Sequence, residues 1–243
     1  PKRKAGKKKT TRKKATKKAA RRASSARSTK MVYSFGAERT EGSREMRDTL
    51  GGKGANLADM TSIGLPVPPG FTITADACAA YHDAGGRLPR GLMDEVAKHV
   101  RRLEREAGKK FGSPRNPLLV SVRSGAAVSM PVMMDTVLNL GLTDATCAAL
   151  ANATGNERFA LDAYRRLINM FGDVVMGVDH HEFEGAFREI KARYGANIDA
   201  HVPVEGMREL VVAYKAAYGR HVGAPFPQAP ADQFAAAPAN RPA

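Results

Sequence analysis

Residues 120–142 read VSVRSGAAVSMPVMMDTVLNLGL, and the rest of the chain is interpreted around this stretch. The run LLVSV at residues 118–122 is typical of a short buried strand, and residues 136–140 predict a second one. Arg123 ends the first strand and leads into small residues and a methionine-rich loop. Small residues after a strand let backbone N–H groups approach an anion, and an adjacent arginine supplies a planar fork of donors for phosphate oxygens. The stretch therefore predicts a phosphate-binding turn, although the residues alone also fit an ordinary turn beside a surface arginine.

A second glycine-rich turn, LGGKG at residues 50–54, leads into a segment with helical periodicity. Leu57, Met60 and Ile63 recur at helical spacing and predict a helix over residues 55–63 with these side chains inward. Free N–H groups and the helix dipole make such a helix start a site for anions, and Lys53 adds an ammonium group. The pattern is not a Walker A motif, which requires Gly-x-x-x-x-Gly-Lys-Ser/Thr. A structural turn with a solvated lysine is the simpler interpretation of these residues alone.

Taken together, the two turns resemble the N-terminal part of the ATP-grasp nucleotide-binding domain of the pyruvate phosphate dikinase family. The resemblance rests on residues 122–142 and on LGGKGANLADMTSIGLPVPPGFTIT at residues 50–74, and it extends more loosely over residues 31–228. Phosphoenolpyruvate synthases share the Gly-Gly-Lys-Gly and Pro-Pro-Gly-Phe elements but continue differently after Val-Arg-Ser, so residues 129–135 favour the dikinase. The resemblance implies an α+β fold, with a small mixed sheet followed by a helical region.

The resemblance also supplies the candidate site. The residues that match ATP- and phosphate-binding positions of the family are Lys53, Arg123, Ser124, Gly125, Met134, Asp135 and Thr136. ATP and Mg²⁺ are the implied cofactors, but the family's metal-binding carboxylates, its second phosphate-binding arginine and its phosphocarrier histidine correspond to positions beyond residue 243. No catalytic residue and no metal ligand is therefore expected in this chain.

The family reaction converts ATP, phosphate and pyruvate into AMP, pyrophosphate and phosphoenolpyruvate. We expect a nucleotide-binding fragment of such a phosphotransferase, inactive alone, with a separately encoded C-terminal half as one candidate partner. Two alternatives remain: a fragment similar to phosphoenolpyruvate synthase, and a nucleic-acid-associated protein that works through its N-terminal tail.

The positive charge of the chain is confined to that tail. Residues 1–30 hold 15 of the 39 Lys and Arg residues and no acidic residue, which leaves 24 basic against 24 acidic residues in the remainder. The tail contains no Val, Ile, Leu, Met or aromatic residue, so it cannot offset the entropy of ordering and is expected to be disordered. Counterion-releasing contact with nucleic acid suits this composition, and so does a solubilising extension or a start codon placed upstream of Met31.

Three regions are therefore expected: a basic disordered tail over residues 1–30, an incomplete ATP-grasp domain over residues 31–228, and a disordered Ala/Pro tail over residues 229–243.

Cys78 and Cys147 each lie in an alanine-rich helical context, which predicts buried free thiols and a reducing cytoplasm. No run approaches the ~18 apolar residues of a membrane helix, and no apolar signal-peptide core follows the basic start.

The secondary structure outside the two turns follows from periodicity and turn residues. Strands are predicted at residues 31–35 and 71–73, and helices at 75–84, 91–107, 144–152, 157–171, 181–194 and 203–222. His180 and His181 are adjacent and point in different directions on a helix, so no metal site is expected there.

Val132 departs from the dikinase pattern, which usually has glycine at this place. A β-branched residue does not readily adopt positive φ, and it adds bulk to a loop that is expected to approach phosphate. Val132→Gly should therefore tighten ATP binding, as measured by isothermal titration calorimetry on the two forms. Equal or weaker affinity of the glycine form would contradict this.

Overall fold

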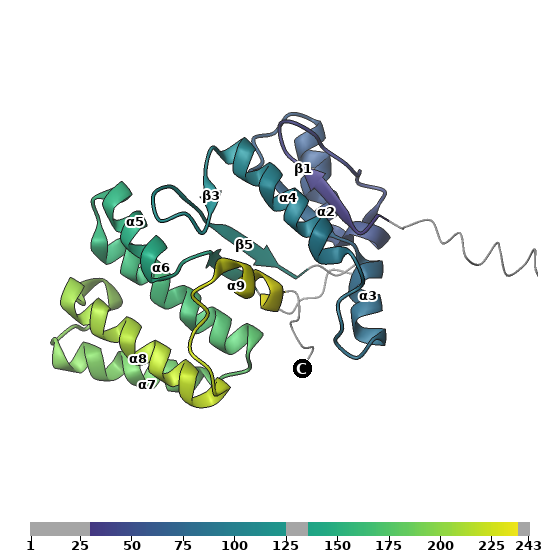
Figure 1. Cartoon of the computed structure of the whole chain (residues 1–243). Coiled ribbons are helices and arrows are strands. Elements are labelled where there is room, and N and C mark those ends of the chain that lie inside the picture. The colour runs from purple at the N-terminus through teal and green to yellow at the C-terminus, as the bar shows by residue number, and fades with distance from the viewer. Residues whose placement is uncertain (1–29, 125–135, 238–243) are drawn as a thin grey trace, which may run out of the picture. The chain divides into compact units, whose positions relative to one another are not determined.

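The computed structural model describes residues 30–124 and 136–237. The chain divides into two units, Pro1–Met31 and Val32–Ala243, and the fold described below is that of the second unit. Its elements form small two-stranded sheets and a larger set of helices, which confirms the expected α+β class (Figure 1).

The N-terminal part of this unit is an antiparallel strand pair covered by helices. Strand β1 (Val32–Phe35) pairs antiparallel with β2 (Gly70–Ile73), which confirms both predicted strands. Helices α2 (Arg47–Ser62) and α4 (Leu92–Ala107) pack against the two strands, and α3 (Ala75–Asp83) follows β2. The Thr74 side chain accepts a hydrogen bond from the backbone N–H of Ala77 at 3.3 Å and so caps α3, as Ser and Thr commonly do at helix starts.

Helix α2 begins earlier than the predicted range of residues 55–63, but it is interrupted within the glycine-rich turn. Gly51 has φ 67° and ψ 165°, a backbone conformation that side-chain-bearing residues rarely adopt. The sequence LGGKG thus forms a break inside α2, and the continuous part of the helix starts next to Lys53.

The buried face of α2 differs from the predicted one. Its buried residues are Leu50, Gly51, Gly54, Ala55 and Ala58. Met60 and Ile63, which were expected to face the core, are 40% and 69% exposed. Small residues occupy the contact because the helix lies very close to β2: a Cβ on Gly54 would fall 2.7 Å from Thr72 Cγ2.

The middle of the chain forms two further strand pairs. Strand β3 (Lys110–Phe111) pairs parallel with β4 (Pro117–Leu118), and β5 (Val120–Arg123) pairs antiparallel with β6 (Thr136–Leu140). The two strands predicted around the opening stretch are confirmed. The prediction that the first is buried is wrong, because β5 alternates between half-buried and exposed residues.

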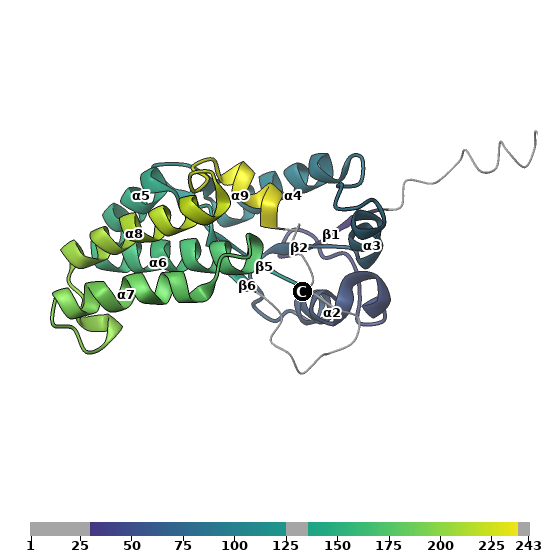
Figure 2. The ribbon, with the colours of Figure 1, turned by 90° about the horizontal axis from the view of Figure 1, so that it is seen from below.

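Four long helices follow β6 and lie side by side in Figure 2. They are α5 (Asp144–Thr154), α6 (Glu157–Met170), α7 (His180–Arg193) and α8 (Val204–Val222). Helix α6 packs against α5, α8 and β6, and a π-helical turn, η1 (Phe171–Val175), extends it. The fully buried large side chains include Tyr164, Leu167, Ile168, Phe171, Phe183, Met207, Leu210 and Tyr214. The four predicted helices are therefore confirmed, and the large apolar side chain of Phe159 at the start of α6 is 51% exposed.

One charged side chain lies inside this helical layer. Arg165 is 6% exposed and forms ion pairs with Asp162 at 2.8 Å and Asp199 at 3.3 Å. Its guanidinium also lies over the ring of Phe187, 4.5 Å from the centroid. A buried charge of this kind is tolerated only when paired, so the network fixes the loop at Asp199 to α6 and α7.

The C-terminal segment differs from the disordered tail expected from residue 229. Pro230–Ala236 form helix α9, in which Gln233 and Phe234 are buried. Gln233 finds partners just after β6 and Phe234 finds them on β2 and β3, and no local composition rule could foresee those partners.

The two cysteines are free, but they are not equivalent. Cys147 is buried on α5 as predicted, and burial raises the pKa of its thiol to about 11. The prediction for Cys78 is wrong, because this thiol is exposed on α3.

Across residues 30–124 and 136–237, no helix has the length and apolar character needed to span a membrane.

The close approach of α2 to β2 generates a stability prediction. Gly54→Ala would place a methyl group 2.7–2.8 Å from the Thr72 side chain, and overpacking of this kind costs about 1–3 kcal/mol of the free energy of unfolding. Gly185→Ala in α7 is the matched control, since nothing lies within 4 Å of the added carbon and alanine favours helix by about 0.5–1 kcal/mol. Urea denaturation should show opposite signs for the two variants, and a Gly54→Ala protein as stable as the native chain would contradict the packing argument.

Candidate functional site

The two glycine-rich turns identified in the sequence meet in the structure. Lys53 is exposed at the start of the continuous part of α2, and its Nζ donates a hydrogen bond to the backbone carbonyl of Ser124 at 3.3 Å. Ser124 comes directly after Arg123 at the end of β5. A contact across 71 positions of sequence therefore brings the lysine of one turn to the backbone of the residue that follows Arg123.

The end of the β5–β6 pair supplies two further candidates. Arg123 lies opposite Thr136 in the strand register, so these residues are cross-strand neighbours. Arg123 is exposed and Thr136 is half-buried. Arg123 is therefore accessible to solvent at the end of β5, with a hydroxyl-bearing residue as its cross-strand neighbour.

The remaining predicted site residues lie in the segment between these strands. Gly125, Met134 and Asp135 fall outside the described residues, as does Val132. The structure therefore brings together Lys53 and Ser124 in one contact, and Arg123 and Thr136 in one strand register.

Chemically, this arrangement suits a polyanion. A lysine ammonium is a compact positive charge with three donors, and an arginine guanidinium offers a fork that matches two phosphate oxygens. Hydrogen bonds from ionised donors to phosphate are shorter and stronger than neutral ones. Lys53 and Arg123 also start from exposed positions, so neither must leave a buried ion pair before meeting a ligand.

Thr72 is a residue of this region that sequence reasoning missed. Its side chain lies where any side chain at position 54 would have to go, so it sets how closely the Lys53 helix approaches β2. Gly54, one residue after Lys53, is the sequence feature that could have indicated this close contact between the helix and β2.

Ionisable groups elsewhere in the described chain do not form a competing site. Burial is the main cause that raises the pKa of Tyr214 to about 12. Burial also raises the pKa of Tyr164 above its ordinary value. Both belong to the helical core. His180 lies 3.3 Å from Asp173 and 3.3 Å from Glu184, but these are exposed surface pairs. Residues 30–124 and 136–237 contain no group of three or more His, Cys, Asp or Glu side chains that could hold a metal ion.

Comparison with known proteins gives consistent matches. Residues 47–90, which include Lys53, match the family described as pyruvate phosphate dikinase, AMP/ATP-binding domain. The chain is 51% identical over 205 residues to a pyruvate, phosphate dikinase of Rhizobium meliloti (strain 1021), which covers 84% of this chain and 23% of that protein. It is 49% identical over 205 residues to the chloroplastic pyruvate, phosphate dikinase of Flaveria pringlei, covering 84% of this chain and 21% of the relative.

A third relative extends the comparison slightly. The chain is 50% identical over 208 residues to pyruvate, phosphate dikinase 2 of Zea mays, which covers 86% of this chain and 23% of the relative. The chain thus spans between 21% and 23% of the length of these curated relatives.

Proposed function

Because the chain is related to the N-terminal part of pyruvate, phosphate dikinases, we propose that it binds ATP through Lys53 and Arg123, as the nucleotide-binding segment of a phosphotransferase of that kind. The observation that carries the proposal is the hydrogen bond from Lys53 Nζ to the Ser124 carbonyl, which joins two cationic turns that are far apart in sequence. The relatives named above are dikinases, and this supports the dikinase over the phosphoenolpyruvate synthase alternative.

In this proposal the chain supplies the cationic side of the ATP site. Phosphoryl transfer depends on positioning the phosphates and on neutralising their spread negative charge, and exposed Lys53 and Arg123 are suited to both tasks. Ser124 and Thr136 lie at the same end of the β5–β6 pair, and Gly125, Met134 and Asp135 are proposed to contribute to the same phosphate site. Mg²⁺ is proposed to arrive on the nucleotide phosphates, since the described residues do not form a site for it.

The overall reaction proposed is that of the relatives' name, in which ATP, phosphate and pyruvate give AMP, pyrophosphate and phosphoenolpyruvate. The pyruvate and phosphocarrier steps are assigned to a partner polypeptide equivalent to the rest of the relatives' length, so the chain alone is expected to bind ATP without turnover. The two free thiols fit a reducing compartment such as the cytoplasm.

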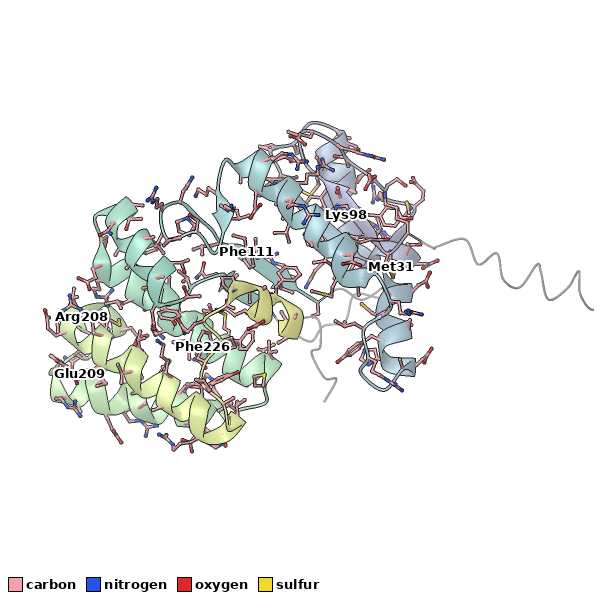
Figure 3. All side chains as sticks on the ribbon, in the orientation of Figure 1. Met31, Lys98, Phe111, Arg208, Glu209 and Phe226 are labelled. Carbon is pink, nitrogen blue, oxygen red and sulfur yellow. The ribbon has the colours of Figure 1, made fainter. Side chains whose placement is uncertain are left out.

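A charge-removal pair tests ATP binding. Lys53→Met should weaken ATP binding at least tenfold in calorimetry, because a charge-assisted phosphate contact contributes about 1.5–3 kcal/mol. Lys98→Met removes the same charge from an exposed position on α4 and should leave the affinity unchanged (Figure 3). Equal affinities for the native chain and a folded Lys53→Met variant, or equal losses for both variants, would rule out the proposed site.

A second function is favoured by one observation, the separation of charge along the chain. Fifteen basic and no acidic residues fall in residues 1–30, and the remainder is neutral. A segment of this kind binds nucleic acid through phosphate contacts, without reading sequence. We propose that the tail gives the nucleotide-binding segment a non-specific affinity for nucleic acid.

Retention on immobilised duplex DNA tests the tail. The full chain should be retained at low salt and released as salt rises, with a steep linear dependence of log affinity on log salt. A chain starting at Met31 should pass through without retention. If both forms bind equally, the affinity resides in the folded part and the proposed role of the tail is wrong.

A further inference from the structure

The C-terminal segment, residues 226–237, forms what is here named the strap. It runs from the end of the helical layer to helix α9, which contacts β6 (Figure 1). At its start, Phe226 is 3% exposed and packs among the rings of Tyr164, Phe171 and Tyr218, with centroids 5.3–6.0 Å away. The strap is therefore anchored in the helical core at one end.

The middle of the strap is fixed to the end of the β5–β6 pair by one side chain. Gln233 is fully buried, and its Oε1 accepts a hydrogen bond from the Gly141 N–H at 3.0 Å. Its Nε2 donates to the carbonyls of Leu142 at 2.8 Å and Pro227 at 2.9 Å. Gly141 directly follows β6, so the amide holds the end of the strand pair opposite to Arg123.

The next residue of the strap reaches the other half of the candidate site. The ring of Phe234 packs against Phe71 on β2, with centroids 6.1 Å apart, and edge-on against Phe111 on β3, with centroids 6.2 Å apart. Strand β2 also carries Thr72, against which the Lys53 helix lies at Gly54. The ring of Pro230 in the strap also lies close to Gly112, because a Cβ added to this glycine would fall 3.0 Å from the proline ring.

Two consecutive buried residues of the strap thus hold the two elements that carry the cations. Gln233 holds the strand pair that ends in Arg123, and Phe234 holds the sheet on which the Lys53 helix rests. Among the described residues, Lys53 is joined to the end of that strand pair by an exposed 3.3 Å hydrogen bond to Ser124, and exposed contacts of this type are weak. A rigid, buried connection is better suited to fixing the separation of the two turns.

From this arrangement we propose that Gln233 and Phe234 are positioning residues for the phosphate site: they set the relative placement of Lys53 and Arg123 without contacting the ligand. The proposal rests on ATP binding by these two cations. In this proposal the strap does more than cover the hydrophobic core, because Gln233 contacts the element that carries Arg123 and Phe234 contacts the sheet that supports the Lys53 helix.

The first experiment measures placement without any ligand. Nitroxide labels are attached to Asn56→Cys on α2 and Ser121→Cys on β5, both exposed positions, in a chain carrying Cys78→Ser and Cys147→Ala. Electron–electron double resonance should give a narrow label–label distance distribution in this parent chain. Phe234→Ala should broaden or shift it, whereas Phe159→Ala, the same change at a 51% exposed ring on α6, should not.

The second experiment measures ATP affinity in a double-mutant cycle. Phe234→Ala should weaken ATP binding about tenfold in the native background, since two aligned charge-assisted contacts become one. In the Lys53→Met background it should have no further effect on ATP affinity, although its effect on thermal stability should persist. A purely structural role predicts the same fold-change in both backgrounds, and that result would overturn the proposal.

Gln233→Glu supplies a variant whose effect reverses with pH. An ionised carboxylate cannot donate to the Leu142 and Pro227 carbonyls, whereas the protonated acid regains one donor. The label–label distribution of this variant should therefore narrow on acidification, while that of the parent chain stays constant. This readout remains available if Phe234→Ala fails to fold.

The outcomes separate the two proposals. An unchanged distance distribution in folded Phe234→Ala and in Gln233→Glu at neutral pH would overturn the positioning role. A changed distribution, in a chain whose native form shows no ATP binding, would support the positioning role and refute the proposed function.

Discussion

The arrangement of the candidate site depends on the close contact between α2 and β2. At Gly54 the helix backbone lies so near Thr72 that a single methyl group would overlap its side chain. This contact fixes the height of the helix above the sheet, and the break at Gly51 fixes where its continuous part begins. Lys53 lies between these two glycines, so its position is set by backbone geometry on both sides. A lysine in an ordinary surface helix would have no comparable restraint, because its long side chain and solvated backbone leave it many conformations.

The helical layer gives this region a rigid base. Its core consists of large aromatic and aliphatic side chains, and close-packed interiors of this kind transmit displacement instead of absorbing it. Arg165 in this layer is paired with two carboxylates, and Thr143 and Thr146 form a reciprocal capping box at the start of α5. The start of α5 is also bonded to Gln228, whose Oε1 accepts from the Asp144 N–H at 2.9 Å. The segment that connects β6 to α5 is therefore held in place by hydrogen bonds between its backbone groups and side chains.

Local structure could be read from the sequence because its causes are local. Strands β1, β2 and β6, the caps at Thr74 and Thr143, and the four long helices all follow from spacing, capping residues and turn glycines. The failures concern tertiary contacts. Met60 and Ile63 have helical spacing, but the packing face of α2 is chosen by its glycines and alanines, which carry little hydrophobic signal. Helix α9 has a composition typical of a disordered tail and is ordered by partners about 90 to 160 residues away, Gly141, Leu142 and Phe71. The candidate residues themselves came from family resemblance, since each turn alone also fitted an ordinary loop.

The charge distribution explains why such tertiary positioning matters for anion recognition. Outside residues 1–30 the chain carries equal numbers of basic and acidic side chains, so its net charge does not favour a polyphosphate. At physiological salt the Debye length is about 8 Å, and cations farther apart than this act on a ligand almost independently. Selective binding of a triphosphate by a neutral body therefore requires that a few cations converge on it at short range. The Lys53–Ser124 contact brings the first turn to the second, and the buried side chains of the strap restrain the elements behind both. For the proposed ATP site, placement of the cations by packing would therefore matter as much as their charge.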